Sequence, residues 1–122
     1  MRMFAKGRLT RRTPGTMNGL EAKYAATLAI DQASGAIVGY WFEAITLKLA
    51  PDTRYTPDFM VMHNDGTLEF REVKGFMEDD AWVKLKVAAD KFPIFRFTLI
   101  RQKLKRDGGG WDVKMLNEGS GT

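Results

Sequence analysis

Two short segments carry side chains that could bind a metal ion together. Thr56-Pro57-Asp58-Phe59 contains one Asp, and Arg71-Glu72-Val73-Lys74-Gly75 contains one Glu and one Lys. Both segments are predicted to be β-strands, and alternate side chains of a strand share a face, so Glu72 and Lys74 lie on the same side. If the strand of Asp58 pairs beside them, two carboxylates and one ammonium converge. Close carboxylates repel unless a cation or a proton relieves them, and hard oxygen ligands suit Mg²⁺ or Mn²⁺.

This combination indicates a metal-dependent nuclease. A Lys beside such a metal can stabilise an attacking hydroxide or the charge that builds on a phosphate. The alternative is that Glu72 and Lys74 lie on an ordinary solvent face. Against it, the same face of the strand carries the apolar Leu68 and Phe70. The face is therefore expected to be partly buried, where charged groups need a partner.

The residue pattern of these segments resembles the signature of the PD-(D/E)xK nuclease superfamily. Pro57-Asp58 followed by Glu72-Val73-Lys74 matches the signature, and the turn Asn64-Asp65-Gly66 lies between them. The wider segment is similar to small phage and prophage members, including Holliday-junction resolvases, and the resemblance spans residues 17–104. It implies a restriction-endonuclease-like core, Mg²⁺-dependent cleavage that leaves a 5′-phosphate, and the backbone carbonyl of Val73 as a further metal ligand.

A further acid is expected from the helix predicted at residues 17–30. Several families of the superfamily supply a Glu from this helix, and Glu21 would occupy that position. Glu21 lies beside the apolar positions of the helix, so its side chain is expected to reach over the sheet edge towards Asp58 as a catalytic residue and metal ligand. Glu43, in the first predicted strand region, is the alternative acid.

The excess of basic residues lies at the N-terminus. The formal net charge is +4, and residues 1–16 contain five of the nineteen basic residues and no acidic one. Basic arms commonly lie along phosphate backbones, whereas the alternative is a solvated terminus that aids solubility. The DNA contacts that we predict are Arg8, Arg11 and Arg12 in the arm, Arg54 before the motif, and Lys84 and Lys86 after it.

A second basic strip follows near the C-terminus. Between residues 96 and 106 the chain has five basic residues and no acidic one. The strip could be a second phosphate track, or an exposed strand whose charges prevent edge-to-edge association. Its members are Arg96, Arg101, Lys103, Lys105 and Arg106.

The composition excludes several other classes. The 122 residues have a 44% hydrophobic fraction, which fits one globular domain. The absence of Cys excludes disulfides, zinc–thiolate sites and cysteine catalysis, and it fits a reducing cytoplasm, that of a bacterial host if the phage resemblance holds. The single His63, predicted to be a turn residue, leaves little room for a His-based metal site or a Ser-His-Asp triad. No apolar run is long enough to span a membrane.

The pattern of apolar residues predicts the elements that position these groups. We expect a basic flexible arm at residues 1–16, a single nuclease domain at 17–118 and a disordered tail at 119–122. The fold is predicted to be α/β, a mixed central sheet flanked by helices in the order α-β-β-β-α-β. The expected elements are a helix at 17–30, extended chain at 37–50 with a bend near Glu43, strands at 55–62 and 67–74, a helix ending near 92, a strand at 95–104 and an edge strand at 111–116.

These observations predict a Mg²⁺-dependent DNA endonuclease. No recognition helix or finger is found, so cleavage of branched DNA such as a Holliday junction is expected rather than sequence-specific cutting. A junction requires two cuts and therefore two active sites, which predicts a homodimer. The alternatives are a nuclease that nicks without junction specificity, a non-catalytic DNA-binding module on the same fold, and a structural phage protein with a basic arm.

Overall fold

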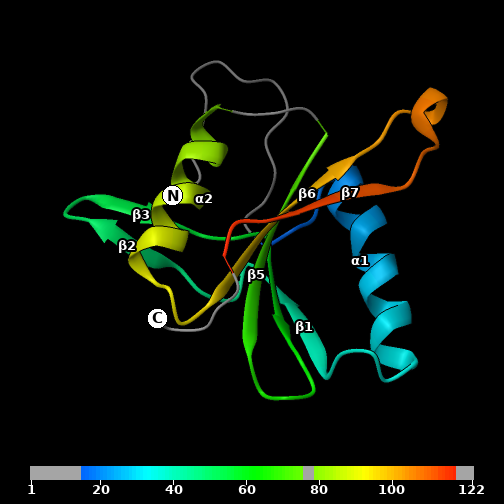
Figure 1. The fold of residues 1–122 in the computed structure, drawn as a ribbon, viewed down its shortest axis with the longest axis horizontal. Coiled ribbons are helices and arrows are strands. Elements are labelled where there is room, and N and C mark those ends of the chain that lie inside the picture. Colours follow the sequence, from blue (N-terminus) through cyan, green and yellow to red (C-terminus); the bar gives the residue numbers. More distant parts are fainter. Residues whose placement is uncertain (1–14, 76–78, 118–122) are drawn as a thin grey trace.

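The computed structural model describes residues 15–75 and 79–117, with only the backbone of residues 79–81 (Figure 1). The predicted tail and most of the predicted arm lie outside the described residues. Within the described part of the chain, no helix is long and apolar enough to cross a membrane. The elements in chain order are α1 (Gly19–Ala33), β1 (Gly39–Phe42), β2 (Leu47–Ala50), β3 (Thr53–Tyr55), β4 (Phe59–Met62), β5 (Leu68–Lys74), α2 (Asp79–Lys91), β6 (Arg96–Gln102), the 3₁₀ helix η1 (Lys105–Asp107) and β7 (Trp111–Met115).

The main sheet has five strands in the order β1-β4-β5-β6-β7, and β2 and β3 form a separate two-stranded hairpin. β5 and β6 are parallel, and the other neighbours in the main sheet are antiparallel. Parallel strands need a crossover connection, and α2 is in that connection. Without the inserted hairpin, the helices and the main sheet follow the predicted order α-β-β-β-α-β, with β7 added at the edge. The predicted mixed α/β fold is confirmed.

Helix α1 begins at a capping box. The side chain of Asn18 accepts a hydrogen bond from the backbone N–H of Glu21, and the side chain of Glu21 accepts one from the backbone of Asn18. This exchange satisfies two donors that a helix start otherwise leaves open. The apolar side chains Tyr24, Ala25 and Leu28 of this helix are buried against the sheet.

The predicted strand at residues 55–62 is wrong as a continuous element. β3 ends at Tyr55 and β4 begins at Phe59, because Pro57 has no N–H to donate to a ladder. β3 pairs with β2 instead, and the bend predicted near Glu43 separates β2 from β1: Glu43 has a φ of 49°. The backbone N–H of Glu43 donates to the carbonyl of Asp58 (2.8 Å). This hydrogen bond holds the bend between β1 and β2 beside the break between β3 and β4.

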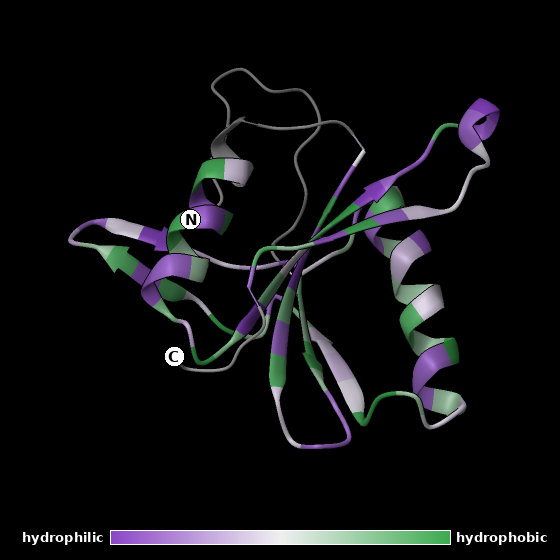
Figure 2. Ribbon diagram, viewed as in Figure 1, coloured by the Kyte–Doolittle hydropathy of each residue, from purple (hydrophilic) through white to green (hydrophobic). Residues whose placement is uncertain are grey.

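The main sheet is packed on both faces. One face, which carries Phe70 and Leu99, packs against α2 and the β2–β3 hairpin. The other face, which carries Val73 and Ile100, packs against α1. Apolar and polar residues therefore mix along β5, and the strand does not have one solvent-exposed face and one buried face (Figure 2). Charged residues on either face of β5 must find partners inside the protein.

Candidate active site

The antiparallel pairing of β4 and β5 brings Asp58 and Glu72 together. Phe59 pairs with Arg71, so the residue before Phe59 lies next to the residue after Arg71. Oδ2 of Asp58 accepts a hydrogen bond from the backbone N–H of Val73 at 2.8 Å. Asp58 is fully buried and Glu72 is only 3% exposed. The predicted meeting of these two carboxylates is confirmed.

Both oxygens of Glu72 are held by neighbouring side chains. The hydroxyl of Tyr55, at the end of β3, donates to Oε1 at 2.6 Å, and Nζ of Lys74 lies 3.2 Å from Oε2. The side chain of Lys74 is 22% exposed, so its ammonium lies where the buried acids meet the surface. Tyr55 had no predicted role. Its position three residues before Asp58 was the only signal that the sequence offered.

The environment raises the pKa of Glu72 from its ordinary value of 4.5 to about 7. The largest cause is burial, and the second is the charge of Asp58; the charge of Lys74 and the hydrogen bond from Tyr55 act in the opposite direction. Two carboxylates are therefore confined at one buried point and repel each other. A divalent cation would relieve this repulsion more fully than Lys74 does.

A Glu72→Gln substitution is expected to stabilise the protein at pH 8 in EDTA by roughly 1–3 kcal/mol, the scale of a shift from 4.5 to about 7. The pKa of Glu72 is higher in the folded state than in the unfolded state. The free energy of unfolding therefore falls as pH rises from 4.5 to about 7, and the ionised Glu72 destabilises the folded protein above that pH. Urea unfolding at pH 5 and pH 8 measures the effect, with the exposed Asp90→Asn as the control. A variant less stable than wild type at pH 8 would contradict the raised pKa.

The two acids expected to complete the site have other contacts. Oε1 of Glu21 accepts the backbone N–H of Asn18 at 2.9 Å, within the capping box of α1. Oε1 of Glu43 accepts the backbone N–H of Gly15 at 3.3 Å. Among the side chains that the structure describes, in residues 15–75 and 82–117, no group of three or more acidic or histidine side chains is arranged to hold a metal ion. Neither acid therefore forms such a group with Asp58 and Glu72 in this structure.

The pair of carboxylates nevertheless fits a hard divalent cation. Mg²⁺ is commonly bound in proteins by one or two carboxylates, and water and substrate phosphates supply the remaining ligands. Asp58 and Glu72 are oxygen donors, and the repulsion between them is what such an ion removes. Thiol and clustered imidazole ligands, which would favour zinc, do not occur at this point of the sheet.

The basic residues predicted to bind DNA are only partly described. Lys84 donates from Nζ to the carbonyl of Arg54 at 3.2 Å, which ties α2 to the β2–β3 hairpin. Nζ of Lys86 lies 5.2 Å from the centroid of the Trp82 ring. These residues belong to the elements that cover the Glu72 face of the sheet. Arg8, Arg11 and Arg12 lie outside the described residues.

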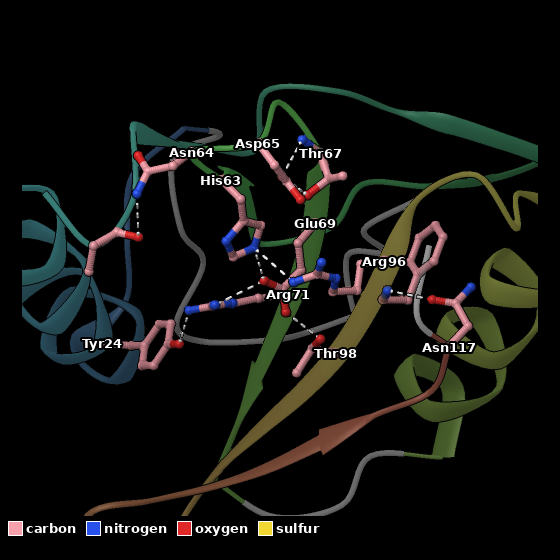
Figure 3. A network of polar contacts seen from close by, with 12 residues as sticks. Tyr24, His63, Asn64, Asp65, Thr67, Glu69, Arg71, Arg96, Thr98 and Asn117 are labelled. Carbon is pink, nitrogen blue, oxygen red and sulfur yellow. Dashed lines mark hydrogen bonds and ion pairs between the residues drawn. The ribbon is translucent and has the colours of Figure 1, made fainter. Parts of the chain in front are cut away.

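A second buried polar network lies on the opposite face of the sheet (Figure 3). Oε1 of Glu69 lies 2.6 Å from Nε2 of His63 and accepts a hydrogen bond from Arg71 at 2.9 Å, while Oε2 accepts one from Thr98. Arg71 also donates to the hydroxyl of Tyr24 at 2.8 Å. The sequence alone predicts a turn position for His63 and does not predict this network. The sequence feature that indicates the network is that the charged residues Glu69 and Arg71 share one face of the strand with the apolar Val73.

The network holds Glu69 as a carboxylate. Burial alone would raise the pKa of Glu69, but the hydrogen bond and charge of Arg71, with the hydrogen bonds of Thr98 and His63, outweigh it and lower the pKa. The pKa of this carboxylate is thus lowered by its protein partners, whereas the ion pair with Lys74 does not prevent the pKa of Glu72 from rising. The contrast separates a structural ion pair from a site that can receive a cation.

Comparison with known proteins identifies a family for this chain. No curated protein and no solved structure matches this chain. Residues 44–108 match the family described as "Protein of unknown function (DUF1064)". This segment runs from the bend after β1 to the residue after η1, and it includes Asp58, Glu72 and Lys74. Because the match covers more than half of the 122 residues, the chain belongs to the DUF1064 family.

Proposed function

We propose that this protein is a Mg²⁺-dependent DNA endonuclease of the PD-(D/E)xK type. The observation that carries the proposal is the buried pair of Asp58 and Glu72, with Lys74 at its surface edge. Burying two mutually repelling carboxylates costs stability, and an acid whose pKa is raised to about 7 is typical of functional sites. The resemblance of the sequence to the superfamily signature supports the same chemistry.

The residues take distinct roles in this proposal. Asp58 and Glu72 would hold Mg²⁺, with the carbonyl of Val73 as the ligand that the resemblance implies. When bound, Mg²⁺ supplies Lewis-acid stabilisation of the phosphate charge and lowers the pKa of water. Lys74 would orient the attacking water and stabilise the charge on the phosphate oxygens. Tyr55 fixes the position of the Glu72 carboxylate through its hydroxyl.

Glu21 has a conditional role. Its carboxylate now accepts the N–H of Asn18 at the start of α1. A role as metal ligand would use the other oxygen of the carboxylate, or replace this hydrogen bond when DNA and metal bind. Leu20, the residue before Glu21, lies next to Gly75 at the end of β5, so the start of α1 is close to the motif strand.

The proposed substrate is DNA, with branched DNA as the preferred form. Arg54, Lys84 and Lys86 would contact phosphates on the Glu72 side of the sheet, and the basic N-terminal residues would hold the backbone further away. Two subunits would be needed to cut both strands of a junction, so the proposed functional unit is a homodimer.

Cleavage of labelled DNA tests the proposal. We expect the wild type to cut a four-way junction by paired nicks in Mg²⁺ and not in EDTA, and Lys74→Ala to cut roughly 10²-fold more slowly. Lys23→Ala, on the exposed surface of α1, is the matched control and should cut normally. A linear duplex and a single strand are tested in parallel.

The other outcomes decide between the alternatives. Equal cutting of junction and linear duplex would indicate a nicking nuclease without junction specificity. Tight DNA binding without cutting in Mg²⁺ or Mn²⁺ would indicate a DNA-binding module and would overturn the proposed activity.

A further inference from the structure

A pocket opens beside the end of the motif strand. Its volume is about 320 Å³, and its wall includes Gly75, the residue that follows Lys74. The pocket therefore starts where the candidate active site ends. The remaining lining comes from the end of β6, η1 and β7: Arg101, Gln102, Lys103, Leu104, Asp107 and Asp112.

The parallel pairing of β5 and β6 sets Arg101 beside Lys74. The register pairs Glu72 with Leu99 and Lys74 with Arg101. Paired residues of neighbouring strands project to the same face, and the strands lie about 4.8 Å apart. Arg101 thus places a second positively charged residue beside Lys74, on the neighbouring strand of the sheet.

The side chain of Arg101 is held loosely. Its NH2 lies 3.4 Å from Oδ2 of Asp112 on β7, and the two side chains are 42% and 56% exposed. An exposed ion pair of this kind contributes little and exchanges readily. The planar guanidinium matches a phosphate, to which it can donate two parallel hydrogen bonds. Asp112 is placed to hold Arg101 when no phosphate is present.

We propose that this pocket binds the backbone phosphate of DNA that lies next to the scissile phosphate, with Arg101 as its main ligand. The inference rests on the proposed nuclease function and assigns a substrate contact to that site. Successive phosphates of one strand advance about 3.4 Å along the helix axis. A strand whose scissile phosphate lies at Lys74 therefore brings its neighbouring phosphate within reach of Arg101. Lys103, also in the pocket wall, adds a second positive charge, and the wall also carries the carboxylates of Asp107 and Asp112.

Binding measurements with an Asp58→Asn protein test the inference without relying on cleavage. A duplex and a four-way junction are prepared with single methylphosphonates, which remove the charge of one phosphate at a time. We expect several positions to weaken binding, among them the phosphate next to the scissile one, whose neutralisation should cost about tenfold, the scale of one charged hydrogen bond. In Asp58→Asn/Arg101→Gln this position should have no further effect, and the salt slope of log K should fall by about 1.

Two further variants complete the design. Lys23→Gln removes the same charge from exposed α1 and should leave the position-specific penalty in place. Asp112→Asn, which releases Arg101, should strengthen binding. An unchanged penalty at every position in Arg101→Gln, or no DNA binding at all, would overturn the inference. If the methylphosphonate penalty depends on Arg101 but the wild-type protein cuts no DNA, the phosphate-binding role of the pocket would stand and the proposed nuclease activity would be rejected.

Discussion

Replacing Asp58 with Asn is expected to slow DNA cleavage roughly 10³-fold, the loss expected when about 4 kcal/mol of transition-state stabilisation is removed. The substitution keeps the shape of the side chain, and its amide oxygen can still accept the N–H of Val73, which the carboxylate accepts at 2.8 Å. What disappears is the negative charge that would bind Mg²⁺ together with Glu72. Single-turnover cleavage of the best DNA substrate, in saturating Mg²⁺, measures the effect.

The same variant has a second readout that is independent of catalysis. Without the charge of Asp58, one of the two causes that raise the pKa of Glu72 is gone, so the folded protein should be more stable than wild type at pH 8 in EDTA. Mg²⁺ should raise the melting temperature of wild type and not of the variant. Asp90→Asn, at an exposed position of α2, controls for the change of one charge. Full cleavage activity in Asp58→Asn would reject Asp58 as a ligand.

Replacing Glu69 with Ala is expected to lower the free energy of unfolding by about 3–5 kcal/mol, the cost of leaving a buried charge unpaired. Glu69 is 3% exposed and is bonded to Arg71, His63 and Thr98. Its removal leaves the guanidinium of Arg71, whose side chain is 16% exposed, without its carboxylate. Urea unfolding at pH 7 measures the loss.

The pH dependence and a double variant test the cause of that loss. Because the pKa of Glu69 is lowered in the folded state, its contribution is present above the unfolded value near 4.5 and is lost as pH falls further. The gap between wild type and variant should therefore shrink in acid. Glu69→Met/Arg71→Met removes both charges and should be less destabilised than the sum of the two single Met variants. Additive effects would mean that the pair is not coupled.

The central part of the site could be predicted because local rules determine it. Strand alternation puts Glu72 and Lys74 on one face, and the Asp65-Gly66 turn, with φ of 87° at Gly66, fixes the hairpin register that delivers Asp58. The break at Pro57 was missed because the apolar residues on both sides continue the strand pattern. That break frees Tyr55 to reach Glu72 from a different sheet.

Other features depend on long-range packing and could not be derived from one strand at a time. The Glu69 network needs α1 to supply Tyr24, 47 residues away from Arg71. The pairing of Arg101 with Asp112 needs β7 to return along β6. Alternation predicts which residues share a face, but it does not reveal that both faces of β5 are covered.

The β4–β5 hairpin also has a consequence for the order in which the chain folds. Closing this one short loop is sufficient to bring Asp58 to the N–H of Val73, a separation of fifteen residues along the chain. Such local contacts cost little loop-closure entropy and tend to form early. Arg101 reaches β5 only after the α2 crossover is complete. Asp58 and Glu72 are therefore expected to come together while the residues of the phosphate pocket are still unfolded. A cation that binds these two acids could then stabilise the folding nucleus.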